Sequence, residues 1–266
     1  MRTFPTPDPI AATIELGAGS VRIAAVDRDD TEVRVTPRDP LRAADVRAAE
    51  QAHIDLANGV LTVTVGKRLL SLSRGAVNVD VALPSSSRLA VAVSSADLRV
   101  DGTVADCRFD AASGSAALDV VEGNLKGATA SGDIAVRRLL GNANVSTASG
   151  EVSIDVLDGG LKFQAASGSV TVGTLRGTVH SRTASGSLTV TDAEAGSVSA
   201  ATASGDVEVG VRQGTAANLD LDSRSGDVRS DLAPAAGPES DDRRLAVHAR
   251  TASGDIAIRR ATTVPV

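Results

Sequence analysis

A Ser-Gly dipeptide recurs eight times in this 266-residue chain, and its regular spacing constrains the fold more than any other feature. The spacings between successive copies are 18, 18, 18, 18, 19, 21 and 28 residues. Ala precedes the serine in every copy except one, where Arg224 stands. Self-similarity at a fixed short period is typical of stacked repeats. The motif serines are Ser113, Ser131, Ser149, Ser167, Ser185, Ser204, Ser225 and Ser253.

Apolar residues alternate with polar ones on both sides of each motif. The third and fifth residues after the serine are almost all apolar, and so are most of the residues six and four places before it. This period of two is typical of a strand with one buried face. A glycine ten residues after the serine, as at Gly159 and Gly177, predicts a corner between two strands. The motif therefore predicts two strands in each repeat.

These patterns predict an all-β protein: a parallel β-solenoid (single-stranded β-helix) with coils of about 18 residues and an N-terminal β-rich cap. Residues 1–72 are expected to form the cap, continuous with a repeat region over residues 73–266, so that the chain is one structural domain. A helix is expected over Leu41–Glu50 and an exposed loop over Leu232–Arg244. The motif serines are expected to stack as a structural ladder, with a partial ladder of threonines two residues earlier.

Composition and charge argue against several classes of function. The net charge is −6 and the chain contains neither Trp nor Tyr, so we expect no nucleic-acid binding. No apolar run is long enough to predict a transmembrane segment. The N-terminal sequence lacks the apolar stretch of a secretory signal, and the single cysteine agrees with a reducing compartment; both favour a cytoplasmic location.

No candidate metal or catalytic site emerges from the residue spacing. An acidic residue follows the motif glycine in five copies, which raises calcium binding, but a turn hydrogen bond to the local backbone is the simpler interpretation. His180 and His248 share a column but are expected three coils apart, about 14 Å, too far to share a zinc ion. Cys107 falls in an apolar column and is expected to be a buried hydrophobe. Since no base recurs beside the serines, we expect neither catalytic residues nor a cofactor.

Two features are candidates for contact with a partner. Arg108, Lys126, Lys162 and His180 form a broken basic stripe, interpreted either as a solvated strand face or as a face that contacts anions. An irregular segment mixes leucines with basic residues, and it either covers an open coil end or forms a contact loop for a partner or an anionic membrane surface. The residues of this segment are Lys67, Arg68, Leu69, Leu70, Leu72 and Arg74.

The repeated unit A-S-G-[DES]-[VIL]-x-[VIL], as in Ala130–Val136 and Ala203–Val209, resembles a bacterial β-strand-repeat family of unknown function of the "putative adhesin" type. The opening ATIELGAGSVRIAA also looks like actinobacterial members of this family. The resemblance covers nearly the whole chain. It implies a parallel β-solenoid, no established activity and no catalytic residues, while the adhesin label implies a surface location.

Together these observations predict a non-enzymatic scaffold or binding protein, adhesin-like, with an unknown protein partner and a monomeric or weakly oligomeric state. The alternatives are a self-assembling β-helix of the cytoskeletal kind and a carbohydrate-active β-helix enzyme. The enzyme is disfavoured because the chain lacks the Trp and Tyr side chains that stack on sugars.

Overall fold

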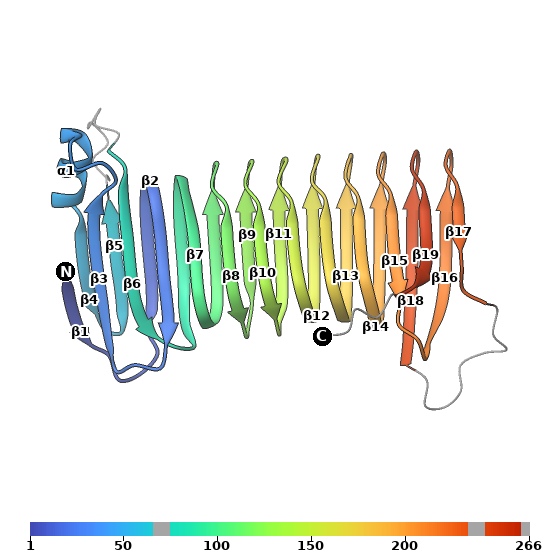
Figure 1. Cartoon of the computed structure of the whole chain (residues 1–266), viewed down its shortest axis with the longest axis horizontal. Helices are drawn as coiled ribbons and strands as arrows, with labels where there is room; N and C mark the ends of the chain where they lie inside the picture. The colour runs from blue at the N-terminus through green and yellow to red at the C-terminus, as the bar shows by residue number, and fades with distance from the viewer. Residues whose placement is uncertain (66–74, 234–242, 262–266) are drawn as a thin grey trace. The chain divides into compact units, whose positions relative to one another are not determined.

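The computed structural model describes residues 1–65, 75–233 and 243–261, and its contacts divide the chain into two compact units. Unit 1 is Met1–Ala135 and unit 2 is Val136–Val266. Strands dominate both units (Figure 1), and the described residues contain one helix, α1 (Ala43–Glu50), which confirms the helix expected there. The predicted division between residues 72 and 73 lies outside the described residues and stays a prediction.

Unit 1 is built around the long strand β2, which pairs in parallel with β7 on one side and with β5 and β6 on the other. Antiparallel strands finish this part of the sheet, since β3 pairs with β6, β1 with β3 and β4 with β5. β7 continues into parallel pairs with β8 and then β9. The strands are β1 (Arg2–Pro5), β2 (Ala11–Val26), β3 (Asp30–Pro37), β4 (His53–Ala57), β5 (Val60–Val65), β6 (Val77–Pro84), β7 (Ser87–Ala111), β8 (Ala116–Val121) and β9 (Leu125–Thr129).

Unit 2 stacks like residues on like residues. Val152, Val170 and Leu188 are successive Cα partners, 18 residues apart, as the motif spacing predicts. β10 (Ile134–Leu139) begins at the division between the units. The other strands are β11 (Asn142–Thr147), β12 (Val152–Ala165), β13 (Val170–Thr183), β14 (Leu188–Thr202), β15 (Val207–Val211), β16 (Thr215–Ser223), β17 (Val228–Ser230), β18 (Arg243–Thr251) and β19 (Ile256–Arg260).

The last repeats of unit 2 are out of sequence order. We name each repeat by its motif serine: the Ser225 repeat contains β16 and β17, and the Ser253 repeat contains β18 and β19. β18 pairs with β14 on one side and β16 on the other, while β19 lies between β15 and β17. Figure 1 shows the red Ser253 repeat between β14 and β15 on one side and the orange Ser225 repeat on the other. The Ser225 repeat is therefore the outermost one, although the Ser253 repeat comes last in the chain.

The core consists of the alternating apolar columns. Val172, Val190 and Val209 are completely buried in successive repeats, whereas the residue before each of them on its strand is exposed or half-buried. Phe109 and Phe163, the largest buried side chains, are also inaccessible to solvent. Burial of one such side chain stabilises the fold by about 1.5–3 kcal/mol. Stacked columns of Val, Leu and Ile thus supply the driving force without aromatic residues other than phenylalanine.

The expectation of a plain parallel β-solenoid is wrong. The paired strands include a closed six-strand parallel β-barrel, with further strands outside it. The physical reason lies in long strands that continue through the predicted corners: Gly159 and Gly177 lie inside β12 and β13, with φ of 149° and 144°. Such a strand pairs with two neighbours, as β7 does with β8 and β9 and β14 does with β15 and β18. Branched pairing of this kind allows a sheet to close.

Candidate functional site

The motif serines lie at exposed turns. Their backbone N–H groups, rather than their side chains, make the recorded contacts between repeats: Ser185 donates to the carbonyl of Ala166 at 2.9 Å and Ser253 to that of Ala203 at 2.9 Å. Ser113 donates in the same way to the carbonyl of Ser94 at 2.9 Å. The serine column is thus aligned by backbone bonds, and a ladder of side-chain hydroxyls stays a prediction.

The glycine after each serine is the constrained residue of the motif. A Cβ atom on Gly186 would lie 2.0 Å from the carbonyl oxygen of Gly168, and a Cβ on Gly205 would lie 2.2 Å from that of Gly186. A Cβ on Gly132 would likewise lie 2.0 Å from the carbonyl oxygen of Gly114. Real Cβ atoms do not approach backbone oxygens so closely, so only glycine permits this stacking distance. The sequence already contained the signal, because this column never varies.

The residue after the motif glycine links neighbouring repeats. The carboxylate of Asp206 accepts a hydrogen bond from the N–H of Asp255 at 2.9 Å, and that of Asp255 accepts from the N–H of Asp227 at 2.9 Å. In the preceding repeats the Ser187 hydroxyl oxygen accepts from the N–H of Asp206, at 3.1 Å. This differs from the expected turn bond to the local backbone. Asp and Ser share the column because both provide an oxygen acceptor.

Threonine stands two residues before five of the eight motif serines, and these threonines are buried or half-buried. Thr202 and Thr251 donate through Oγ1 to the carbonyls of Gly186 and Gly205, both at 3.2 Å. These acceptors are the same glycine carbonyls that exclude a Cβ atom. Thr202 and Thr251 therefore support the close approach of the repeats at the turn, whereas the buried Oγ1 atoms of Thr129, Thr147 and Thr183 have no hydrogen-bond partner among the described residues.

The two histidines of the shared column are closer than expected. His180 is the Cα partner of Ser199, which is the partner of His248, so one strand separates them, at about 9.6 Å. The prediction that the two histidines lie three coils apart was wrong, because the Ser253 repeat lies next to the Ser204 repeat. Among the described residues, no group of three His, Cys, Asp or Glu side chains is placed to hold a metal ion.

A basic face covers part of unit 2, and we define it by Lys162, His180, Arg182, His248 and Arg250. All five side chains are exposed, and they occupy two adjacent columns on β12, β13 and β18. Between them β14 contributes the small residues Ser199 and Ala201. Lys162 and Arg182 have no ion-pair partner within the described ranges. Lys126 and Arg108 of the predicted stripe lie in unit 1, where Arg108 is paired with Asp110 at 2.6 Å.

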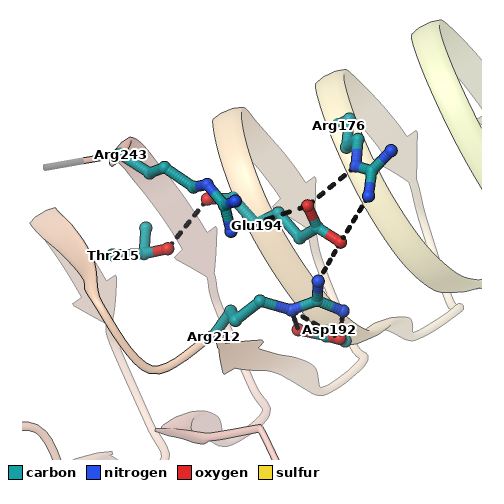
Figure 2. Close-up of polar contacts among 6 residues, drawn as sticks. All are labelled: Arg176, Asp192, Glu194, Arg212, Thr215 and Arg243. Atoms are coloured by element: carbon teal, nitrogen blue, oxygen red, sulfur yellow. Dashed lines mark hydrogen bonds and ion pairs between the residues drawn. The ribbon is translucent and has the colours of Figure 1, made fainter. Parts of the chain in front are cut away.

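A buried glutamate organises a separate cluster of charges at an irregular point of β14 (Figure 2). Leu175 pairs with Ala193 but Arg176 pairs with Ala195, so Glu194 is the extra residue of a β-bulge. The bulge explains the single 19-residue spacing of the motif. Only 4% of the Glu194 side chain is exposed, because partly exposed arginines lie over it. The irregular spacing was visible in the sequence, but its ionic partners were not.

Three arginines surround Glu194. Arg176 Nε donates to Glu194 Oε2 at 2.7 Å, Arg212 donates to Oε1, and Arg243 Nη1 lies 3.8 Å from Oε2. Arg212 also binds Asp192, and Thr215 Oγ1 donates to the backbone carbonyl of Glu194 at 2.8 Å. Since Arg176 lies on β13, Thr215 begins β16 and Arg243 begins β18, the cluster joins these three strands to β14.

The arginines keep Glu194 ionised. Its hydrogen bond with Arg176 is the largest cause that lowers the pKa of Glu194, and it outweighs the opposing effect of burial. The same bond raises the pKa of Arg176, and bonding to Asp192 raises the pKa of Arg212. A general acid requires a raised pKa, so this arrangement fits an ion-pair network that holds strands together rather than an acid–base pair.

Cys107 is 2% exposed and lies in the core of unit 1, which confirms its expected burial. Burial raises the pKa of its thiol to about 12, so the thiolate is scarce at neutral pH. The segment Lys67, Arg68, Leu69, Leu70, Leu72 and Arg74 lies outside the described residues, and its partner contact stays a prediction. No described helix is long and apolar enough to cross a membrane.

We predict that Gly186→Ala lowers the free energy of unfolding by about 2 kcal/mol or more, because the new methyl group meets the Gly168 carbonyl. Ser185→Ala, one residue away at an exposed side chain, is the matched control and should change it by less than about 0.5 kcal/mol. Urea denaturation of both variants measures the difference. Equal effects at the two positions would contradict the assignment of the constraint to glycine.

We also predict that Glu194→Gln lowers the free energy of unfolding by about 1–3 kcal/mol at neutral pH. The lowered pKa of the folded state means that the carboxylate stabilises the fold fully above the ordinary glutamate value of 4.5, and this stabilisation is lost as the pH falls through the lowered pKa. The gap between the two proteins should therefore narrow in acid. Glu208→Gln, which removes an exposed ion pair with Arg259, is the control and should cost under about 0.5 kcal/mol. A gap for Glu194→Gln that is constant with pH would contradict the ionic role.

Comparisons with known proteins place this architecture. A crystal structure described as a putative adhesin from Bacteroides fragilis NCTC 9343 is 9% identical, with a TM-score of 0.50, over 97% of this chain and 95% of that one. A putative lipid binding protein from Parabacteroides distasonis ATCC 8503 is 15% identical over 97% and 95%, with a TM-score of 0.45. A putative adhesin from Parabacteroides merdae ATCC 43184 is 12% identical over 96% and 94%, with a TM-score of 0.37.

At these identities the first likeness concerns the fold alone, and the two lower scores support no inference about this chain. No curated protein matches the chain. The likeness to actinobacterial sequences stays a prediction. The model of one family, Toastrack DUF4097, matches residues 12–262. Since this match spans nearly all of the chain, the protein belongs to the Toastrack DUF4097 family.

Proposed function

We propose that the protein is a non-enzymatic binding module, adhesin-like in character, that contacts an extended anionic ligand through the basic face of unit 2. The observation that carries the proposal is the register of this face: Lys162 lies beside His180, and Arg182 follows two residues along the same strand. A strand spacing of about 4.8 Å makes these charges a regular array. An extended ligand with repeated negative charges meets such an array at several points.

The charge of the rest of the chain strengthens the contrast. The net charge is −6, so most of the surface repels an anion, and a local cluster of cations attracts it to one place. Asp220 pairs with His248 at 3.3 Å and lies 3.7 Å from Arg250, which partly neutralises one side of the face. The uncompensated charge is therefore centred on Lys162 and Arg182.

The arrangement supports binding better than catalysis. Asp192 and Glu194, the carboxylates of the buried cluster, are both bonded to arginines. The Bacteroides fragilis structure that shares the fold is described as a putative adhesin, which agrees with this role. A cytoplasmic location and a monomeric or weakly oligomeric state stay predictions.

The test uses heparin as a defined extended polyanion. We predict that the wild-type protein is retained on immobilised heparin at low salt and that Lys162→Glu with Arg182→Glu abolishes the retention, because the central cations become anions. The matched control, Arg38→Glu with Arg47→Glu, makes the same change in net charge at exposed positions of unit 1 and should leave retention nearly unchanged. Absence of wild-type retention, or equal loss in both double variants, would overturn the proposal.

A further inference from the structure

We propose that the outer edge of the Ser225 repeat is a strand-addition site for an extended segment of another protein in which apolar and basic residues alternate. The edge is formed by the backbone of β16 and β17, and the aspartates of β16 continue the two columns of the basic face beside it. The inference concerns the unpaired backbone of this edge and does not rest on the anionic ligand.

The first observation is that this edge is open. β16 pairs with β18 along all nine of its residues, and no strand pairs with its other side within the described ranges. The buried columns are uncovered at the same place: Val228 is 46% exposed, whereas its Cα partner Ile256 in the inner repeat is fully buried. Leu219 and Leu221 are half-buried, although their partners Val247 and Ala249 are inaccessible. One more strand would complete the columns.

The second observation is the charge of the edge. Asp220 and Asp222 are the exposed residues that alternate with the two leucines of β16. On the inner side these aspartates stand opposite His248 and Arg250 of β18, with His248 Nδ1 3.3 Å from Asp220 Oδ2. The chain itself thus shows which strand β16 accepts: a parallel one with apolar residues turned inward and basic residues turned outward. Opposite charges on neighbouring strands favour that pairing.

The same charges disfavour a second copy of this edge. Two copies related by a twofold axis would place the β16 aspartates of one against those of the other, and like charges directly opposite destabilise a sheet. Charged edge residues commonly prevent association between identical chains. The occupant that fits is therefore a basic, extended segment of a different chain, bound by strand addition.

The backbone shows which groups are available. Arg224 donates its N–H to the carbonyl of Thr251, so the alternate residues Asp222 and Asp220 also direct their backbone groups toward β18. Leu219 and Leu221 consequently direct their N–H and C=O groups outward. An added strand would bond to the backbone of these two leucines while its apolar side chains cover theirs.

The experiment uses the full-length protein and a labelled peptide, RRLAVHART, which has the sequence of β18. We expect saturable binding by fluorescence polarisation. Alternate residues of the peptide form two sets, or phases, and only one phase directs its N–H groups toward β16. N-methylation of that phase should weaken binding about tenfold or more, whereas N-methylation of the other phase should have little effect. These peptides leave the protein unaltered, so a folding defect cannot explain the result. No saturable binding, or equal effects of the two phases, would overturn the proposal.

Two further readouts identify the edge. Asp220→Lys with Asp222→Lys should weaken binding of RRLAVHART, and the peptide RRLAVEAET should restore it, because the charges are exchanged. Hydrogen exchange should slow at the N–H groups of Leu219 and Leu221 while β18 stays protected. Strand addition would be overturned if the exchanged peptide failed to bind a folded double variant. It would also be overturned by loss of protection in β18, because this loss shows that the peptide replaces the chain's own strand.

Discussion

The close approach of backbone at the motif glycines is the constraint on which the rest of the structure depends. In unit 2 the carbonyl of one glycine occupies the space where a side chain on the next glycine would lie, as at Gly168 and Gly186. This contact fixes the register of neighbouring repeats. The register places Val190 beside Val172 in the core, and at the turn it places the N–H of Ser187 beside the hydroxyl oxygen of Ser169. The exposed columns, including the basic face, are aligned by the same means.

Two departures from regularity give unit 2 its individual features. The extra residue Glu194 makes a bulge whose carboxylate collects arginines from neighbouring repeats. The Ser253 repeat lies inside the Ser225 repeat, so that Arg243 reaches this cluster and the acidic strand β16 becomes the outer edge. A stack in simple sequence order would place His248 and Arg250 at the end instead. The order of repeats therefore determines which charges are paired and which edge is available.

The sequence predicted the strands, their inward faces and the stacking of the central repeats, because alternation and spacing report local structure directly. It did not predict the closed barrel, since the sequence does not show that a strand continues through Gly159 and Gly177 and branches between two partners. The outermost repeat departs from the motif at two positions, although the sequence alone did not identify it as outermost: Arg224 replaces the usual Ala, and Ser230 replaces an apolar core residue. Terminal repeats are commonly atypical in this way. The arginine partners of Glu194 depend on long-range topology and left no local signal.

Disulfide trapping in unit 2 tests the register and the repeat order most directly. Neighbouring parallel strands place equivalent Cα atoms about 4.8 Å apart, within the range that a disulfide spans, whereas two steps give about 9.6 Å. Under mild oxidation, Ser204→Cys with Ser253→Cys should link rapidly, as should Ser225→Cys with Ser253→Cys. Ser204→Cys with Ser225→Cys should stay reduced, as read by gel mobility and peptide mass. Preferential linkage of the Ser204 and Ser225 positions would contradict the account.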